Sequence, residues 1–292
     1  MKLVSISALS TALVAGAATA TAEPAYGPPQ DELNPAVTYS FQHPGTLPIG
    51  MNDTECTPSA AHPRPVVLLN GAFLDKYANW AELAPRLAAQ GYCVFGLDYG
   101  ARGPLHQTGN LRDSAAQISA FVDRVLAATG AREVDLVGYS EGALVALHYL
   151  NVLGGDRRVG TLISLSGPLL GMSSHGMTRM IASLPGGLAA YGQLLPSAAD
   201  AATGSSFLAE TAAGGLTRPT VRYVTISSRA DLIVDADESR LPEGPEVTNL
   251  VVQDLCATSR VQHEGVVYDD FTLSLVTHGL DPRSAPEPRC TV

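Results

Sequence analysis

Six short stretches of the chain are apolar along most of their length, and segments with helical spacing lie between them. "PVVLL" (65–69) and "YCVFGLDYG" (92–100) flank "WAELAPRLAAQG" (80–91), whose apolar residues recur at helical spacing before a glycine. A strand that is apolar throughout is buried on both faces, which is typical of a parallel sheet covered by helices on both sides. The alternation therefore predicts a doubly wound, mostly parallel α/β sheet.

The same alternation continues toward the C-terminus. "DSAAQISAFVDRVLAATG" (113–130) predicts an amphipathic helix capped by Asp113, and "VDLVG" (134–138) predicts a strand that leads into a second helix. Further strands are predicted over "GTLISLSG" (160–167), "TVRYVTISS" (220–228) and "EVTNLVVQDL" (246–255). With 292 residues, of which 46% are hydrophobic, the chain is long and apolar enough for one large α/β domain, which we place at residues 65–292.

Two segments depart from this pattern. Residues 23–64 are rich in Pro, Asn, Thr and Gly and predict an extended lead-in laid over the domain surface. Residues 168–216 contain Met172, Met177 and Met180, many Leu and Ala, and few charges, without a clear strand. This segment fits either a pair of packing helices or a mobile apolar cap (lid) over a site.

The N-terminus has the features of an export signal. Met1-Lys2 is followed by an apolar run to about Ala20, and Ala20-Thr21-Ala22 forms an A-x-A cleavage site. The alternative is a membrane anchor, but Ser and Thr interrupt the run and it is short for a span. We therefore expect residues 1–22 to be a signal peptide and the mature protein to be secreted.

Cysteine content and net charge indicate disulfides and argue against zinc-binding and nucleic-acid-binding proteins. An even number of cysteines in an exported chain (Cys56, Cys93, Cys256 and Cys290) predicts two disulfides among three possible pairings, with buried thiols as the alternative. No Cys-x-x-Cys or His-x-x-x-His spacing supports a zinc site. The net charge of −10 and the lack of a Lys/Arg cluster make nucleic acid an unexpected partner.

The sequence "GYSEG" (138–142) joins a predicted strand directly to a predicted helix. A chance G-x-S-x-G match in such a chain is expected roughly 0.2 times. The structural elements around the motif therefore decide whether its serine is functional. Gly138 and Gly142 lack the side chains that would collide in a sharp strand-to-helix turn, which would hold Ser140 strained and exposed above the sheet. Ser140 is therefore the candidate nucleophile, and an incidental turn serine is the alternative.

A nucleophilic serine needs a base, and the base needs an orienting acid. After such a turn the acid is expected first and the histidine second, each just beyond a strand. Asp231 follows "TVRYVTISS" and is the candidate acid, with Asp235 as its rival further along. We expect Leu232, Ile233 and Val234 to tuck beneath Asp231.

The candidate base is His263, which comes after the strand predicted over 246–255. His278 is the other histidine downstream of Asp231, but it lies behind a predicted final helix and so farther from the upper edge of the sheet. A histidine at any one position is more commonly a core or surface residue, and the chain order is what favours His263 here.

Two backbone N–H groups are candidates for stabilising an oxyanion. Glu141 begins the helix after Ser140, where helix N–H groups are free. Ala72 lies in "LLNGAFLDKYANW" (68–80), the loop after the first strand of the core, with Phe73 as the fallback donor and a plain strand-to-helix loop as the alternative.

These motifs give the chain a family resemblance. It resembles the secreted bacterial lipases of class 2, common in actinobacteria, which are α/β-hydrolases. The pieces that carry the resemblance are "CTPSAAHPRPVVLLNGAF", "NWAELAPRLAAQGYCVFGLDYG", "VDLVGYSEGALV", "GSSFLAETAAGG", "VTISSRADLIV" and "VTNLVVQDLC…HEGVVYDD".

The resemblance implies an α/β-hydrolase fold and a role for each matching residue. It implies Ser140 as nucleophile, Asp231 as acid and His263 as base. It also implies disulfides Cys56–Cys93 and Cys256–Cys290. The chain departs from the family in two places: many relatives carry His-Gly where this chain has Asn70-Gly71, and Glu141 stands where lipases often have Gln or another residue.

The expected function is that of a secreted carboxylic-ester hydrolase, a lipase or esterase that needs no metal or organic cofactor. Its expected partners are a lipid or small-molecule ester and, transiently, a lipid interface, and the expected oligomeric state is a monomer. An acyltransferase that uses the same acyl-enzyme and a non-catalytic binding protein on the same scaffold are the alternatives.

Overall fold

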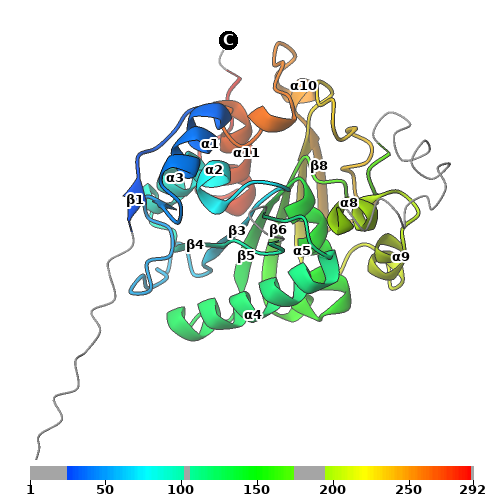
Figure 1. The fold of residues 1–292 in the computed structure, drawn as a ribbon, viewed down its shortest axis with the longest axis horizontal. Helices are drawn as coiled ribbons and strands as arrows, with labels where there is room; N and C mark the ends of the chain where they lie inside the picture. The colour runs from blue at the N-terminus through cyan, green and yellow to red at the C-terminus, as the bar shows by residue number, and fades with distance from the viewer. Residues whose placement is uncertain (1–24, 102–105, 174–194, 291–292) are drawn as a thin grey trace, which may run out of the picture.

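The six apolar runs predicted as strands pair into one parallel sheet. The structure is a computed structural model that describes residues 25–101, 106–173 and 195–290, and Figure 1 shows its fold. The order is β4-β3-β5-β6-β7-β8, and every neighbouring pair is parallel. The strands are β3 (Val66–Leu69), β4 (Val94–Leu97), β5 (Val134–Tyr139), β6 (Val159–Leu165), β7 (Arg222–Ser227) and β8 (Val247–Val251). The predicted α/β sheet is confirmed.

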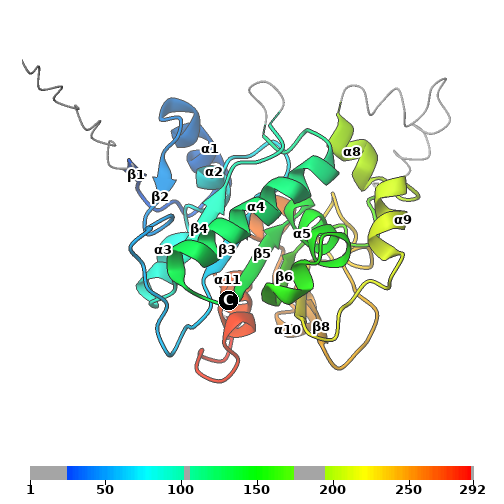
Figure 2. The same cartoon turned by 90° about the horizontal axis from the view of Figure 1, so that it is seen from below.

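Helices cover both faces of the sheet, as continuous apolar strands require. In Figure 1, α4 (Leu111–Thr129) lies below the sheet and α11 (Asp270–Leu280) lies above it. α5 (Glu141–Val152) lies on the α4 face, and α2 (Lys76–Trp80) and α3 (Leu83–Ala89) lie on the α11 face (Figures 1 and 2).

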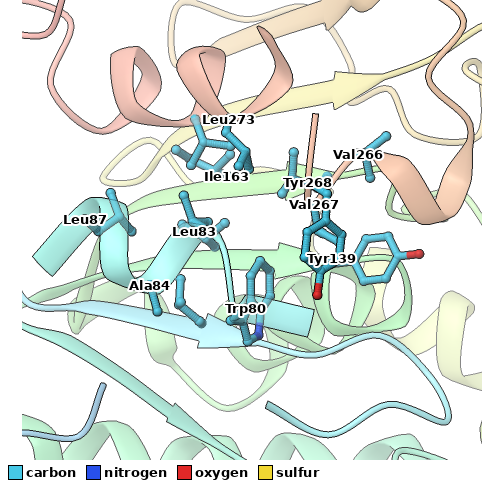
Figure 3. Close-up of a cluster of buried hydrophobic side chains, with 14 of the residues drawn as sticks. Trp80, Leu83, Ala84, Leu87, Tyr139, Ile163, Val266, Val267, Tyr268 and Leu273 are labelled. Atoms are coloured by element: carbon cyan, nitrogen blue, oxygen red, sulfur yellow. The ribbon is translucent and has the colours of Figure 1, made fainter. Parts of the chain in front are cut away.

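Each face has its own hydrophobic core, because successive side chains of a strand point to opposite sides. In β3, Val66 and Leu68 belong to one core, whereas Val67 and Leu69 belong to the other. Figure 3 shows the first core, where Trp80, Tyr139 and Tyr268 lie together. Tyr139, the residue before Ser140, is therefore packed into this hydrophobic core.

The predicted extended lead-in contains a helix, α1 (Leu33–Gln42), so that part of the prediction is wrong. Asn34 and Pro35 are turn-forming residues, but they occupy the first turn of α1, where proline is tolerated. Ala36 is fully buried, and the Tyr39 ring lies 5.0 Å from that of Tyr77 on α2. Short strands β1 (Tyr26–Gly27) and β2 (Leu47–Pro48) flank α1 and pair in parallel.

Two predicted element ends also differ. Helix α4 begins at Leu111, and the side chain of Asn110, not Asp113, caps it by accepting hydrogen bonds from the N–H groups of Arg112 and Asp113. β8 ends at Val251, and the rest of the predicted strand forms the short helix α10 (Val252–Leu255).

The segment 168–216 is described in part. Met177 and Met180 lie outside the described residues. Helices α8 (Pro196–Ala201) and α9 (Ser206–Ala212) lie side by side near α5 (Figure 2). α9 is fixed to α5 by the ring of Phe207, which stacks on His148 at 4.2 Å. Two 3₁₀ helices complete the described elements, η1 (Gly155–Arg157) and η3 (His263–Gly265).

Both disulfides implied by the family resemblance are present. Cys56–Cys93 ties the segment before β3 to the start of β4, and Cys256–Cys290 ties the end of α10 to the C-terminal segment. Among the described residues, no helix combines the length and apolar character needed to cross a membrane. The predicted signal peptide (1–22) lies outside the described residues.

Candidate active site

The turn between β5 and α5 (residues 138–142, here the Ser140 turn) is sharp and strained. Ser140 has φ 50° and ψ −123°, a left-handed conformation that non-glycine residues rarely adopt. A Cβ atom at Gly138 would lie 2.6 Å from the backbone of Ala143, and one at Gly142 would lie 2.5 Å from the carbonyl oxygen of Asn70. Both positions therefore require glycine, as the strand–turn–helix prediction expected.

The structure brings Ser140, His263 and Asp231 together in one hydrogen-bonded chain. Ser140 Oγ lies 2.9 Å from His263 Nε2, and His263 Nδ1 lies 2.8 Å from Asp231 Oδ2. The other oxygen of Asp231 accepts hydrogen bonds from the N–H groups of Ile233 at 2.8 Å and Val234 at 2.9 Å. Asp231 therefore holds the imidazole with Nε2 toward the serine.

The environment of Asp231 favours its ionised form. Burial alone raises the pKa of this carboxyl, but the hydrogen bond and charge interaction with His263 and the two backbone N–H donors outweigh burial. The pKa of Asp231 therefore lies below its ordinary value, and the group is a carboxylate near neutral pH.

The three apolar residues after Asp231 differ from the prediction that all of them pack beneath it. Leu232 and Ile233 are exposed, and only Val234 is buried.

The rival residues lie elsewhere. The N–H of Asp235 donates to Glu238, and Asp231 is the residue that contacts the histidine. His278 belongs to the last turn of α11, on the face of the sheet opposite α5, whereas His263 sits in η3 against the Ser140 turn.

Two side chains that sequence reasoning missed support the site: Ser228 joins the loops of Asp231 and His263, and Tyr139 ties the His263 segment to β5. Ser228, the residue directly after β7, donates to the carbonyl of Val261 at 2.6 Å and accepts from Gln253 Nε2 at 2.9 Å and from Ala230 N at 3.1 Å. The hydroxyl of Tyr139 donates to the carbonyl of His263 at 3.1 Å. Ser228 could have been suspected only from its place at the strand end before Asp231.

The candidate oxyanion donors differ in whether their N–H groups already have a hydrogen-bond partner. The N–H of Phe73 donates to the carbonyl of His106 at 3.0 Å, so the fallback donor is occupied. Within the described part of the chain, no hydrogen bond uses the N–H of Ala72 or that of Glu141. Both residues line one cavity together with Ser140 and His263.

Asn70 supports this loop. Its Oδ1 accepts from the indole N–H of Trp80 at 2.7 Å, and its Nδ2 donates to Asp98 Oδ1 at 3.1 Å. Asn79 in turn accepts from the N–H of Gly71 at 2.8 Å. Asn70, at a position where the resemblance leads us to expect His in many relatives, therefore leaves the loop held on both sides. Asn79 and Asp98 carry no sequence signal for this role, because their partners are set by tertiary packing.

Comparison with known proteins identifies the family. Residues 64–221, more than half of the chain, match the family described as "alpha/beta hydrolase fold". The chain belongs to this family.

Solved structures of two lipases and an esterase resemble this one in fold. Lipase B of Aspergillus fumigatus matches with a TM-score of 0.63 and 18% identity over 80% of this chain and 57% of that one. The mature lipase of Bacillus licheniformis matches with a TM-score of 0.58 and 18% identity over 76% and 94%. An esterase of Pyrococcus furiosus matches with a TM-score of 0.52 and 18% identity over 75% and 82%. The chain thus spans little more than half the length of the Aspergillus enzyme.

The cavity beside Ser140 in this α/β-hydrolase has a volume of about 360 Å³. Its lining is mostly apolar and comes from α1, the loop after β3, the Ser140 turn, the segment after β6, α8 and the loops that carry Asp231 and His263. The lining residues are Leu33, Ala72, Phe73, Leu74, Tyr139, Ser140, Glu141, Pro168, Met172, Leu195, Ser197, Ala198, Ala201, Ile233, His263 and Glu264. A larger groove of about 560 Å³ contains neither Ser140 nor His263, although Leu33 and Glu264 line both spaces. The smaller, apolar cavity is therefore the candidate substrate site.

Glu141, the residue after Ser140, is 6% exposed. Burial raises the pKa of this carboxyl to about 8, with a smaller increase from the charge of Asp200, while a hydrogen bond with Ser197 opposes the rise.

The described residues hold no cluster of three or more His, Cys, Asp or Glu side chains suited to a metal ion.

Proposed function

We propose that this protein is a secreted serine carboxylic-ester hydrolase of the class 2 lipase type. The observation that carries the proposal is the hydrogen-bonded chain Asp231–His263–Ser140, which ends at the wall of an apolar cavity. Lipase and esterase names among the structures of the same fold support the same reaction class.

In the first half of the reaction, Ser140 Oγ attacks the carbonyl carbon of the ester while His263 Nε2 takes the hydroxyl proton. The N–H groups of Glu141 and Ala72 stabilise the negative charge on the carbonyl oxygen. Asp231 keeps the Nδ1 proton on the imidazole and stabilises the imidazolium. The bond to the alcohol oxygen then breaks, His263 returns the proton to that oxygen, and an acyl-enzyme remains.

In the second half, water takes the place of the alcohol. His263 removes a proton from water as its oxygen attacks the acyl carbon, and the proton then passes to Ser140 Oγ as the carboxylic acid leaves. The apolar lining of the cavity favours an acyl chain over a polar peptide, so the proposed substrates are lipid or small-molecule esters.

Several features support secretion. Residues 1–22 have the pattern of a signal peptide, and both disulfides form, as they do in an oxidising compartment. We place the α/β domain at residues 65–292 and propose a monomer that contacts a lipid interface transiently.

The test is the rate of p-nitrophenyl ester hydrolysis by Ser140→Ala. The rate should fall by at least about 10⁴-fold, because neither base nor acid can replace the missing oxygen. Ser166→Ala is the matched control: Ser166 also has a positive φ (46°), it is buried, and its Oγ has no partner within the described residues. Full activity in Ser140→Ala, with the same thermal stability as Ser166→Ala, would refute the proposal.

A further inference from the structure

The loop after β3 has its backbone N–H groups held on both sides of Ala72. The N–H of Gly71 donates to Asn79 Oδ1 at 2.8 Å, and the N–H of Phe73 donates to the carbonyl of His106 at 3.0 Å. The N–H of Ala72, between them, has no partner among the described residues and is a proposed oxyanion donor. Its direction depends on the peptide group that joins Gly71 to Ala72.

The side chain of Gln107 holds this peptide group. Gln107 lies between β4 and α4 and is fully buried. Its amide NH₂ group faces two carbonyl oxygens of the loop after β3, that of Gly71 at 3.2 Å and that of Leu74 at 2.6 Å, and its amide oxygen faces Asn70 Nδ2 at 3.1 Å. The opposite orientation would set the amide oxygen against both carbonyl oxygens. Nε2 therefore donates to Gly71 and Leu74, and Oε1 accepts from Asn70.

The bond to the carbonyl of Gly71 also sets the direction of the Ala72 N–H. A trans peptide group is planar, and its C=O and N–H bonds point in opposite directions. The Gly71 carbonyl and the Ala72 N–H belong to the same peptide group, so a donor that holds the carbonyl turns the N–H away from itself. Gln107 does not line the cavity, whereas Ala72 lines it together with Ser140.

The backbone of Gln107 is itself firmly held. Its φ is 46°, a left-handed conformation that is rare for a residue other than glycine, and its N–H donates to the carbonyl of Tyr99 at 3.1 Å. Its partner Asn70 also donates to Asp98 Oδ1 at 3.1 Å. Asp98, Asn70, Gln107 and the Gly71 carbonyl thus form one chain of hydrogen bonds, in which each bond polarises the next.

We propose that Gln107 is a positioning residue of the oxyanion hole: its side-chain amide holds the carbonyl of Gly71 and so keeps the N–H of Ala72 directed at the developing oxyanion. This inference rests on the proposed ester hydrolysis and on Ala72 as a donor. Without the amide, rotation of this one peptide group would point a carbonyl oxygen at the developing negative charge.

The experiment measures p-nitrophenyl butyrate hydrolysis by Gln107→Met, which keeps the length of the side chain but neither polar atom. Its kcat should fall by at least about tenfold, and at most by about 10³-fold, the effect of losing one oxyanion-hole donor outright. KM should change little, because Gln107 lies outside the lining of the cavity and the lost interaction acts only in the transition state.

Inhibition by heptyl trifluoromethyl ketone separates positioning from general damage. Ser140 Oγ adds to the ketone carbonyl, and the oxygen of the resulting hemiketal carries its negative charge where the oxyanion of the reaction would lie. The inhibition constant should therefore rise in Gln107→Met by about the factor by which kcat falls. A partly unfolded variant would lose kcat in proportion to its folded fraction, but its folded molecules would keep the original inhibition constant.

Thr108→Val is the matched control. Thr108 follows Gln107 directly and is 1% exposed, and its Oγ1 is buried without a hydrogen-bond partner in the described part of the chain. Valine has nearly the same shape as threonine but lacks the hydroxyl. Both kcat and the inhibition constant of this variant should stay those of the unaltered protein.

The inference is wrong if Gln107→Met keeps the original kcat, if its inhibition constant stays unchanged while kcat falls, or if Thr108→Val shows the same losses. Any of these results, with Ser140→Ala inactive, leaves the proposed ester hydrolysis intact. Failure of the proposed function appears differently, as full ester hydrolysis by Ser140→Ala.

Discussion

At the scale of single residues, the site depends on a few polar atoms with fixed partners. Asp231 has both oxygens engaged, one by His263 and the other by two backbone N–H groups, so its direction is set by the chain around it. Ser228 joins the segments that carry Asp231 and His263. The proposed proton transfer therefore depends on residues that never touch the substrate.

Asp231→Asn tests this dependence. The asparagine side chain keeps the shape of aspartate but removes the charge that fixes the Nδ1 proton, so kcat should fall by roughly 10³- to 10⁴-fold. KM should change little, because Asp231 does not line the cavity. Steady-state kinetics at neutral pH, with circular dichroism as a check of folding, measure this. A loss of less than tenfold would show that Asp231 does not orient the base.

At the scale of elements, the strand–turn–helix at Ser140 leaves no space for a larger residue. The backbone of α5 approaches the end of β3 so closely that a side chain at Gly142 would collide with the carbonyl oxygens of Leu69 and Asn70. These carbonyls belong to backbone that cannot rotate away as a flexible side chain would. The two glycines of the motif are thus explained by packing.

Gly142→Ala should destabilise the protein by about 3 kcal/mol, the upper range for overpacking of a close contact. Gly130→Ala is the control. Gly130 ends α4 with φ 68°, and open space surrounds its Cβ position, so the cost is backbone strain alone, roughly 1–2 kcal/mol. Urea unfolding of both variants measures the difference. Equal losses would mean that the close approach at Gly142 is not tight.

The sequence predicted these elements well where a local pattern is sufficient. The strand before Ser140 and the strand before Asp231 are apolar along most of their length and mostly buried, and burial on both faces leaves such runs few alternative structures. Helix α1 escaped prediction because Asn34 and Pro35 look like a loop until α2 is present to bury Ala36 and Tyr39. The supports Ser228, Asn79 and Asp98 also escaped, since their partners are distant in sequence and meet only in the folded chain.

At the scale of the whole molecule, the two disulfides close loops of nearly equal length but at different places. Their sequence separations are 37 residues for Cys56–Cys93 and 34 for Cys256–Cys290, and only the second loop contains His263. Cys256 ends α10, the helix whose Gln253 contacts Ser228. The second disulfide therefore secures the segment that carries the base.

Replacement of each cysteine pair by alanine should cost about 4 kcal/mol in either case, as expected for loops of this length. Activity should separate the two variants. Below the melting temperature of both, the variant without Cys256–Cys290 should lose the larger share of kcat, because the His263 segment is less firmly held. Equal kcat values at a temperature where both are folded would contradict this reading.

The most direct measurement for the account as a whole is the site at which a fluorophosphonate probe reacts. Peptide mass spectrometry of the labelled protein should find the adduct on Ser140. Replacement of His263 by alanine should slow labelling by at least about 10³-fold, since the serine then has no base. An adduct on another residue, or unchanged labelling of Ser140 without His263, would contradict the proposed serine hydrolase.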